Sequence, residues 1–127
     1  MTGSESPAAT IRRAASLMRE RAEAAAEGPW HPVAGIWGDE IATAVIARDG
    51  DPSDPHTWLL ATGFGDAPQQ KATAEHAASW HPLVALAVAV WLDIEATIAE
   101  RGMPDESGSI HPALVVARAY LGEPVTP

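Results

Sequence analysis

The sequence contains no cysteine. Disulfide bonds, cysteine-ligated zinc sites and thiol nucleophiles are therefore all excluded, and the absence fits a reducing compartment. Basic residues are also scarce, because eight Lys and Arg stand against seventeen Asp and Glu, for a formal net charge of −9. Binding to a phosphate backbone needs clustered Lys and Arg. We therefore expect no direct binding of nucleic acid.

Long apolar runs are absent as well. The longest stretch without a charged or strongly polar side chain, residues 82–92, is much shorter than the roughly 20 residues that span a bilayer. No secretory signal is recognisable, and a composition of 46% hydrophobic and 20% charged residues is typical of a globular protein. We expect one cytoplasmic domain over residues 1–127, with a tail at 1–6, a mobile loop at 102–109 and no membrane partner.

The first element that the residue pattern predicts is a helix over about residues 7–27. Ser6 is a good N-cap and Pro7 is tolerated in the first turn. Gly28-Pro29 ends the helix. The stripe at helical spacing that should face the core consists of Ile11, Ala15, Met18, Ala22 and Ala25.

Three short β-prone runs follow, at residues 33–37, 40–48 and 57–62. The first two are separated by Gly38-Asp39, a two-residue break that favours a tight hairpin. The segment 49–55, rich in Asp and Pro, separates the second run from the third. These runs predict a three-stranded antiparallel meander, which is marginally stable alone and needs helices to cover a face.

The rest of the chain is predicted to be helical. We expect helices over about 67–79, capped by Asp66, then over 82–101 and over 112–121. The middle one is apolar on nearly every side, so we expect it to be the buried central helix. The fold class is α+β, a small meander covered by about four helices in the order α-β-β-β-α-α-α. The face of the central helix expected to pack inward carries Leu83, Ala87, Trp91, Ile94 and Ile98.

Several segments together carry a family resemblance: residues 17–25, 28–30, 74–89, 91–92 and 116–122. They resemble a family of small uncharacterised proteins from actinobacteria and their phages, and more distantly the Ead-like early-region proteins of temperate phages. In that family an acidic residue often stands where this chain has Val90, so no role for a carboxylate at that turn carries over. The resemblance implies a phage or mobile-element origin and implies no activity.

Histidine offers the best candidates for chemistry. The weak metal candidates are His76 and His81, which could join Glu75 or a loop aspartate in a metal-dependent hydrolase. They lie five residues apart across a predicted break, however, and so lack the i, i+4 spacing of a helical zinc site. His81 also precedes Pro82, which suits a helix start without any ligand. We therefore expect no catalytic residue, no metal and no cofactor.

Tryptophan is unusually frequent, with five residues beside one Phe and one Tyr. Most should fill space in a core built of small aliphatic side chains. Trp37 and Trp58 lie on short strands of a sheet with one open face, and aromatic residues are common at interface anchors. The interaction candidates are Trp37, Trp58, Trp80 and His81.

The charge is unevenly distributed, since residues 1–50 have a net charge of −2 and residues 51–127 a net charge of −7. In the first helix, Arg19 and Glu23 are placed to pair at i, i+4. Two classes of function remain open. One is a protein–protein interaction module that binds a host protein, or a second copy of itself, through the aromatic sheet face or the acidic second half. The other is the metal-dependent hydrolase. A homodimer could also form through the predicted central helix, because Ala85, Ala89 and Ala96 lie on a side away from its bulky residues and permit close helix packing.

Overall fold

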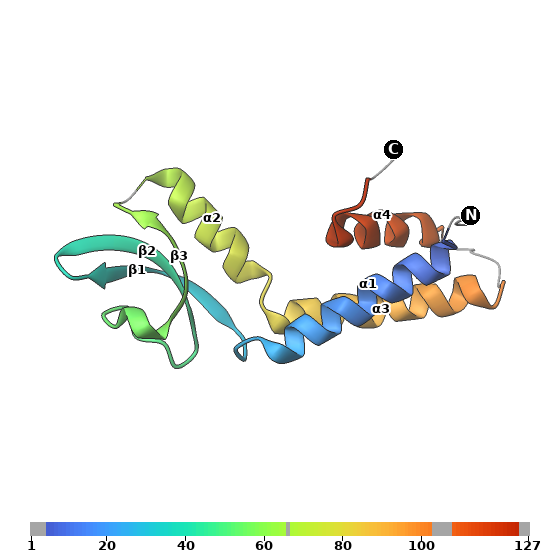
Figure 1. Ribbon diagram of the computed structural model, residues 1–127, viewed down its shortest axis with the longest axis horizontal. Coiled ribbons are helices and arrows are strands. Elements are labelled where there is room, and N and C mark those ends of the chain that lie inside the picture. The colour runs from blue at the N-terminus through green and yellow to red at the C-terminus, as the bar shows by residue number, and fades with distance from the viewer. Residues whose placement is uncertain (1–4, 66, 103–107, 125–127) are drawn as a thin grey trace. The chain divides into compact units, whose positions relative to one another are not determined.

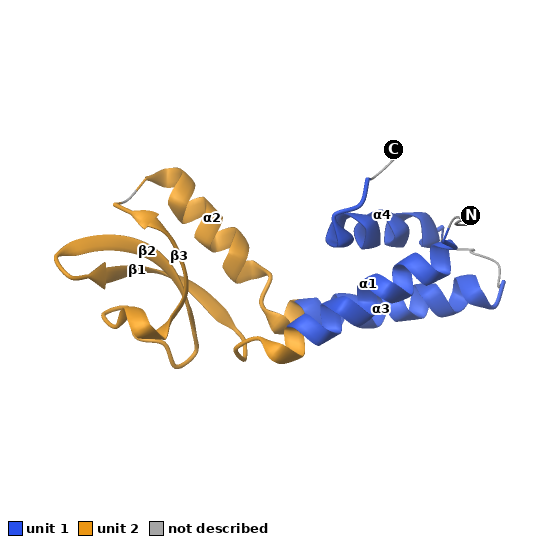
Figure 2. Ribbon diagram, in the orientation of Figure 1, with its two compact units in different colours: residues 1–21, 85–127 blue, residues 22–84 orange. Residues whose placement is uncertain are grey.

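The computed structural model describes residues 5–65, 67–102 and 108–124. The fold is α+β, and the predicted order of helices and strands is confirmed (Figure 1). The chain divides into two compact units, unit 1 (residues 1–21 and 85–127) and unit 2 (residues 22–84), which are coloured separately in Figure 2. The elements are α1 (Pro7–Ala24), β1 (Trp30–Trp37), β2 (Glu40–Ala47), the 3₁₀ helix η1 (Pro55–Thr57), β3 (Trp58–Phe64), α2 (Pro68–Ser79), α3 (Pro82–Glu100) and α4 (Ile110–Leu121).

Unit 2 contains the sheet, which is the antiparallel meander expected from the sequence, in the order β1-β2-β3. The two-residue turn is confirmed, because Trp37 pairs with Glu40 across it. Gly38 has φ 62° whereas Asp39 does not have positive φ, as a type II′ turn requires. β1 begins three residues earlier than predicted and β3 ends two residues later, because edge strands accept the proline and glycine that argued against them.

One face of this sheet is covered by α2, which contacts all three strands. Val45 of β2 packs against Ala74 and Ala78, and the half-buried ring of Trp30 closes the cluster. The alanines let the helix approach the strands closely. The expected cap of α2, Asp66, lies outside the described residues.

Unit 1 is helical, and α1, α3 and α4 supply its core. The predicted inner stripe of α1 is buried at Ile11, Ala15, Met18 and Ala22, whereas Ala25 lies beyond the end of the helix and is exposed. Ser6 caps α1, because its Oγ accepts a hydrogen bond from the Ala9 N–H at 3.1 Å. Within unit 1, the buried residues of α3 and α4 are Ala85, Ala89, Leu92, Glu95, Ala96, Ala113 and Ala117.

The orientation of α3 differs from the sequence prediction. Its alanine side is buried, and its bulky side is largely exposed: Leu83 and Ile94 are each 54% exposed and Val90 is 57% exposed. Helix α3 is therefore not buried on every side. Small side chains allow close helix packing, and ion pairs fix the adjacent side of α3 to α1, so the larger apolar residues face outward.

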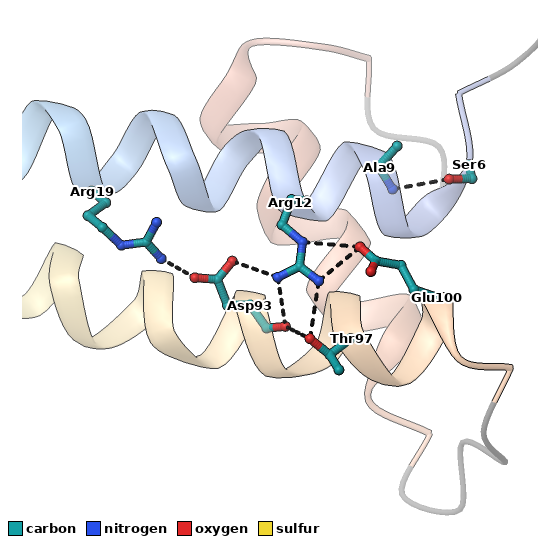
Figure 3. A network of polar contacts seen from close by, with 7 residues as sticks. All are labelled: Ser6, Ala9, Arg12, Arg19, Asp93, Thr97 and Glu100. Carbon is teal, nitrogen blue, oxygen red and sulfur yellow. Dashed lines mark hydrogen bonds and ion pairs between the residues drawn. The ribbon is translucent and has the colours of Figure 1, made fainter.

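These ion pairs form one network between α1 and α3 (Figure 3). The guanidinium group of Arg12 donates to Glu100 at 2.8 Å and to Asp93 at 3.2 Å. It also reaches the Thr97 hydroxyl, and Arg19 pairs with Asp93 from one side. The sequence predicted Glu23 as the partner of Arg19, but the carboxylate that it contacts is Asp93, from a helix distant in sequence.

By length and composition alone, α3 could cross a membrane, and a third of the tested segment is buried. The whole helix passes this test, whereas the run of residues 82–92 taken alone was too short for it. A core helix of a soluble protein passes the same test, and the small α+β fold is compatible with a soluble protein. The predicted tail at 1–6 and loop at 102–109 fall mostly on residues outside those described, so their mobility stays a prediction.

Candidate interaction surface

Three aromatic side chains gather on one face of the sheet in unit 2, and we call Trp37, Trp58 and Phe64 the aromatic surface. The ring centroids of Trp37 and Trp58 are 5.8 Å apart, with the planes tilted at 59°. The ring of Phe64 meets Trp37 edge-on, with centroids 6.5 Å apart. Such tilted and edge-to-face arrangements suit the aromatic quadrupoles and contribute about 0.5–1.5 kcal/mol per pair beyond area burial.

The strand register explains how residues distant in sequence meet here. Trp58 pairs with Ile46 on β2, and Phe64 pairs with Ala42 on the same strand. A glycine in β1 then leaves room for the indole, because a Cβ atom at Gly35 would overlap the ring of Trp58. Packing thus holds Trp58, whose buried Nε1 has no hydrogen-bond partner among the described residues.

The other two rings remain open to solvent. Trp37 is 53% exposed and Phe64 is 55% exposed. At the same end of the sheet, Ile36 and Ile41 pair directly across the hairpin and are both more than half exposed. Because side chains alternate along a strand, these two lie on the opposite face from the aromatic surface. The apolar patch on the aromatic face is therefore formed by the exposed rings, and an exposed apolar patch on a small protein often marks an interaction site.

The structure brings together only two of the four predicted interaction candidates, Trp37 and Trp58. Trp80 and His81 lie at the junction of α2 and α3, at the other end of unit 2 from the β1–β2 turn (Figure 1). The Trp80 backbone N–H donates to the Ala77 carbonyl at the end of α2, and its side chain is 39% exposed.

The backbone of His81 takes part in the start of α3. Its carbonyl accepts a hydrogen bond from the Val84 N–H, which starts α3 as the His-Pro pair predicts. The imidazole packs against Gly28, and its buried Nδ1 has no hydrogen-bond partner among the described residues. These contacts place His81 in local packing.

The weak metal hypothesis finds no geometric support. In the part of the chain that the structure describes, no group of three or more His, Asp or Glu side chains could hold a metal ion. His76 is exposed on α2, and its backbone carbonyl accepts a hydrogen bond from the Ser79 hydroxyl.

The two units differ in net charge by as much as the two halves of the sequence do, since unit 1 contains eight acidic and six basic residues, for a net charge of −2. Residues 22–84 contain nine acidic and two basic residues, for a net charge of −7. All ion pairs among the described residues lie in unit 1, where Arg12, Arg13 and Arg19 neutralise carboxylates. The acidic groups in that network are Glu5, Asp93, Glu100 and Glu123. The carboxylates of unit 2 thus form no ion pair with a described residue.

Sequence reasoning missed Phe64 and the isoleucine pair. Phe64 lies in a Gly-Phe-Gly segment that reads as a loop, and its place on a strand follows only from pairing with β2. Ile36 and Ile41 resemble core residues, yet they lie beside the turn. The turn signal at Gly38-Asp39 fixes their register and could have shown that they are opposite each other.

Comparisons of the chain with protein-family models, with curated proteins and with solved structures gave no match. The resemblance to small phage and actinobacterial proteins therefore stays a hypothesis.

Proposed function

We propose that the protein is a non-catalytic protein–protein interaction module of phage or prophage type, and that it binds a host protein through the aromatic surface. The observation that supports this most is the exposure of Trp37 and Phe64, whose rings meet on one face of the sheet while the Trp37 ring also contacts Trp58. Aromatic anchors with few side-chain torsions lose little entropy on binding and dominate interface energetics. The phage origin rests on the family resemblance alone.

The distribution of ion pairs favours the aromatic surface over the acidic second half as the docking site. Four of the ten carboxylates in that half already have partners within unit 1: Asp93, Glu95, Glu100 and Glu123. A carboxylate that is paired internally has less charge to offer to a second protein. The free acidic groups around the sheet would instead steer association with a basic partner.

The hydrolase hypothesis stays the alternative and has a direct test. Metal analysis of the purified protein, with added zinc or manganese, should find no stoichiometric binding. About one bound equivalent, lost in a His76→Ala variant, would favour the hydrolase over the interaction module.

The interaction module is tested by capture from an actinobacterial lysate on the immobilised protein. The double variant Trp37→Ala and Phe64→Ala should lose a protein that the wild type retains. Trp80→Ala is the matched control, because it removes an exposed tryptophan at the far end of the same unit. Circular dichroism confirms that each variant is folded. Retention by the double variant together with loss by Trp80→Ala would show that the aromatic surface is the wrong site.

A further inference from the structure

The two edges of the sheet differ in how well they are protected. On β1, Pro32 removes one backbone donor, and the Ile36 N–H donates to the Pro52 carbonyl at 3.0 Å. On β3, hydrogen bonds of the sheet run only to β2, and no strand pairs with its outer edge among the described residues. An unpaired strand edge is a template for the backbone of another extended chain.

Two of the usual devices that keep an edge unpaired are absent from β3, because the sequence WLLATGF has no charge and no proline. A third device, the β-bulge, is present at the two register shifts between β3 and β2. Leu59, Leu60 and Ala61 are consecutive and all exposed, so apolar side chains point to both sides of the edge. Soluble proteins usually place lysine or proline at such positions.

Carboxylates lie near both ends of this apolar strand. Before it, Asp51 and Asp54 belong to the loop that leads into η1. The Ser53 hydroxyl and N–H hydrogen-bond to Asp51 and lower the pKa of its carboxyl, so the group stays ionised at neutral pH. At the other end, the Gly65 N–H donates to the Ile41 carbonyl at 2.7 Å, which places β3 next to the turn that carries Asp39 and Glu40.

We propose that the free edge of β3 binds an extended segment of a partner protein, about six residues long, apolar in the middle and basic at both ends. The segment adds a fourth, hydrogen-bonded strand to the sheet. Its apolar side chains cover Leu59 and Leu60, and its basic residues meet the carboxylates at the two ends of β3. This inference rests on the proposed interaction module and specifies the chemistry of its partner.

Charge argues against a second copy of this chain as the occupant. Pairing two β3 strands about a two-fold axis would bring the acidic ends of two units of net charge −7 together. Like charges in apposition oppose such a contact, whereas a basic segment is attracted to it. Two register shifts between β2 and β3 make β3 irregular, and they limit the stretch over which a bound segment can form regular hydrogen bonds with it. Because the segment binds through its backbone as well as its charges, a change to either should weaken binding.

Three synthetic peptides separate these contributions in calorimetric titrations of the intact protein. The peptide KKVTVTVKK should bind, and its affinity should fall as salt is added. The peptide EEVTVTVEE tests charge, and KKVTPTVKK tests backbone pairing because proline cannot donate in the middle of a strand. Both should bind at least about tenfold more weakly. Equal binding of either control peptide would overturn the proposal.

Matched protein variants locate the site. Leu60→Lys places a charge on the β3 edge and should weaken KKVTVTVKK about tenfold or more. Val90→Lys adds the same charge at a more exposed apolar position on α3 and should leave binding unchanged. In amide hydrogen exchange, the bound peptide should protect residues of β3. Protection elsewhere, or a wild-type dimer that Leu60→Lys dissociates, would overturn the assignment.

Lysate capture with the same variants distinguishes this inference from the proposed function. A partner lost by Leu60→Lys and by the Trp37 and Phe64 double variant supports both. A partner lost only by the double variant leaves the interaction module standing and refutes the edge site. A partner retained by both refutes the aromatic surface and the edge together.

Discussion

At the scale of single residues, the two sides of α3 should respond in opposite ways to truncation. Leu92 is fully buried and Ile94, two positions along, is 54% exposed. Leu92→Ala removes packed methyl groups and leaves a cavity, so it should lower the free energy of unfolding by about 2–5 kcal/mol. Ile94→Ala should change it by no more than about 0.5 kcal/mol. Urea unfolding of dilute, monomeric protein measures both, and similar losses would show that the bulky side is covered within the chain.

Glu5 gives a residue-scale prediction on pH. Hydrogen bonds from Arg13, and next from the Thr10 hydroxyl, lower the pKa of its carboxyl from 4.5. A lowered folded-state pKa stabilises the protein above the unfolded pKa, and the stabilisation is lost as pH falls through the folded value. Glu5→Gln should therefore lower the melting temperature at neutral pH, and the difference should vanish in acid. A difference that persists in acid would refute the ion-pair explanation.

Burial of individual residues could be predicted only in part. Ile11, Ala15 and Met18 have one clear stripe, and they are buried as the helical period predicts. In α3 both sides are apolar, so no pattern distinguishes them. The orientation of α3 is determined by partners distant in sequence. Arg12 and Arg19 bind Asp93, and this contact sets which side of α3 meets α1.

At the scale of elements, one carboxylate joins two helices. Asp93 accepts from both Arg12 and Arg19, whereas Glu23, the partner predicted for Arg19, makes no ion pair among the described residues. Asp93→Asn should lower stability by about 1 kcal/mol, and Glu23→Gln by much less, because exposed pairs contribute little and networks contribute more. Thermal unfolding in low and high salt compares them. A larger loss of stability for Glu23→Gln than for Asp93→Asn would favour the predicted Arg19–Glu23 pair over the contact with Asp93.

The elements themselves were largely predictable because their signals are local. Ser6, Gly38 and Pro82 mark starts and turns by their own conformational preferences, and all three mark them in the structure. The aromatic surface could be predicted only in part, because the sequence indicated Trp37 and Trp58 but not Phe64. Trp37 and Trp58 were identified by composition, but their contact depends on Gly35 and on strand register, which no single segment encodes.

At the scale of the whole molecule, the order of the units along the chain predicts cooperative unfolding. Unit 1 is assembled from residues 1–21 and 85–127, with unit 2 between them in the sequence. Helix α1 continues into unit 2 as far as Ala24, and α3 begins there at Pro82. Unfolding one unit interrupts a helix shared with the other, and helix formation is cooperative. Calorimetry should show one transition, consistent with the single domain expected from chain length. Two resolved transitions would contradict this.

Self-association is the other whole-molecule property that can be predicted, and the structure changes the surface through which we expect it. The sequence suggested pairing through the alanines of α3, but Ala85, Ala89 and Ala96 are buried within the chain. What remains open is the stripe of Ala87, Val90 and Ile94 on the opposite side. A two-fold pairing of this stripe is the commonest kind of closed contact.

We expect a homodimer through this stripe, and light scattering across a concentration series measures it. The mass should rise from the 13.3 kDa of one chain toward twice that value. Val90→Asp should restore the single-chain mass, because a carboxylate at an apolar interface must be desolvated without a partner. Leu60→Asp, a matched change on β3, should leave the dimer intact. A wild-type mass of 13.3 kDa at every concentration would remove the dimer, and would leave the apolar side of α3 free for a different protein.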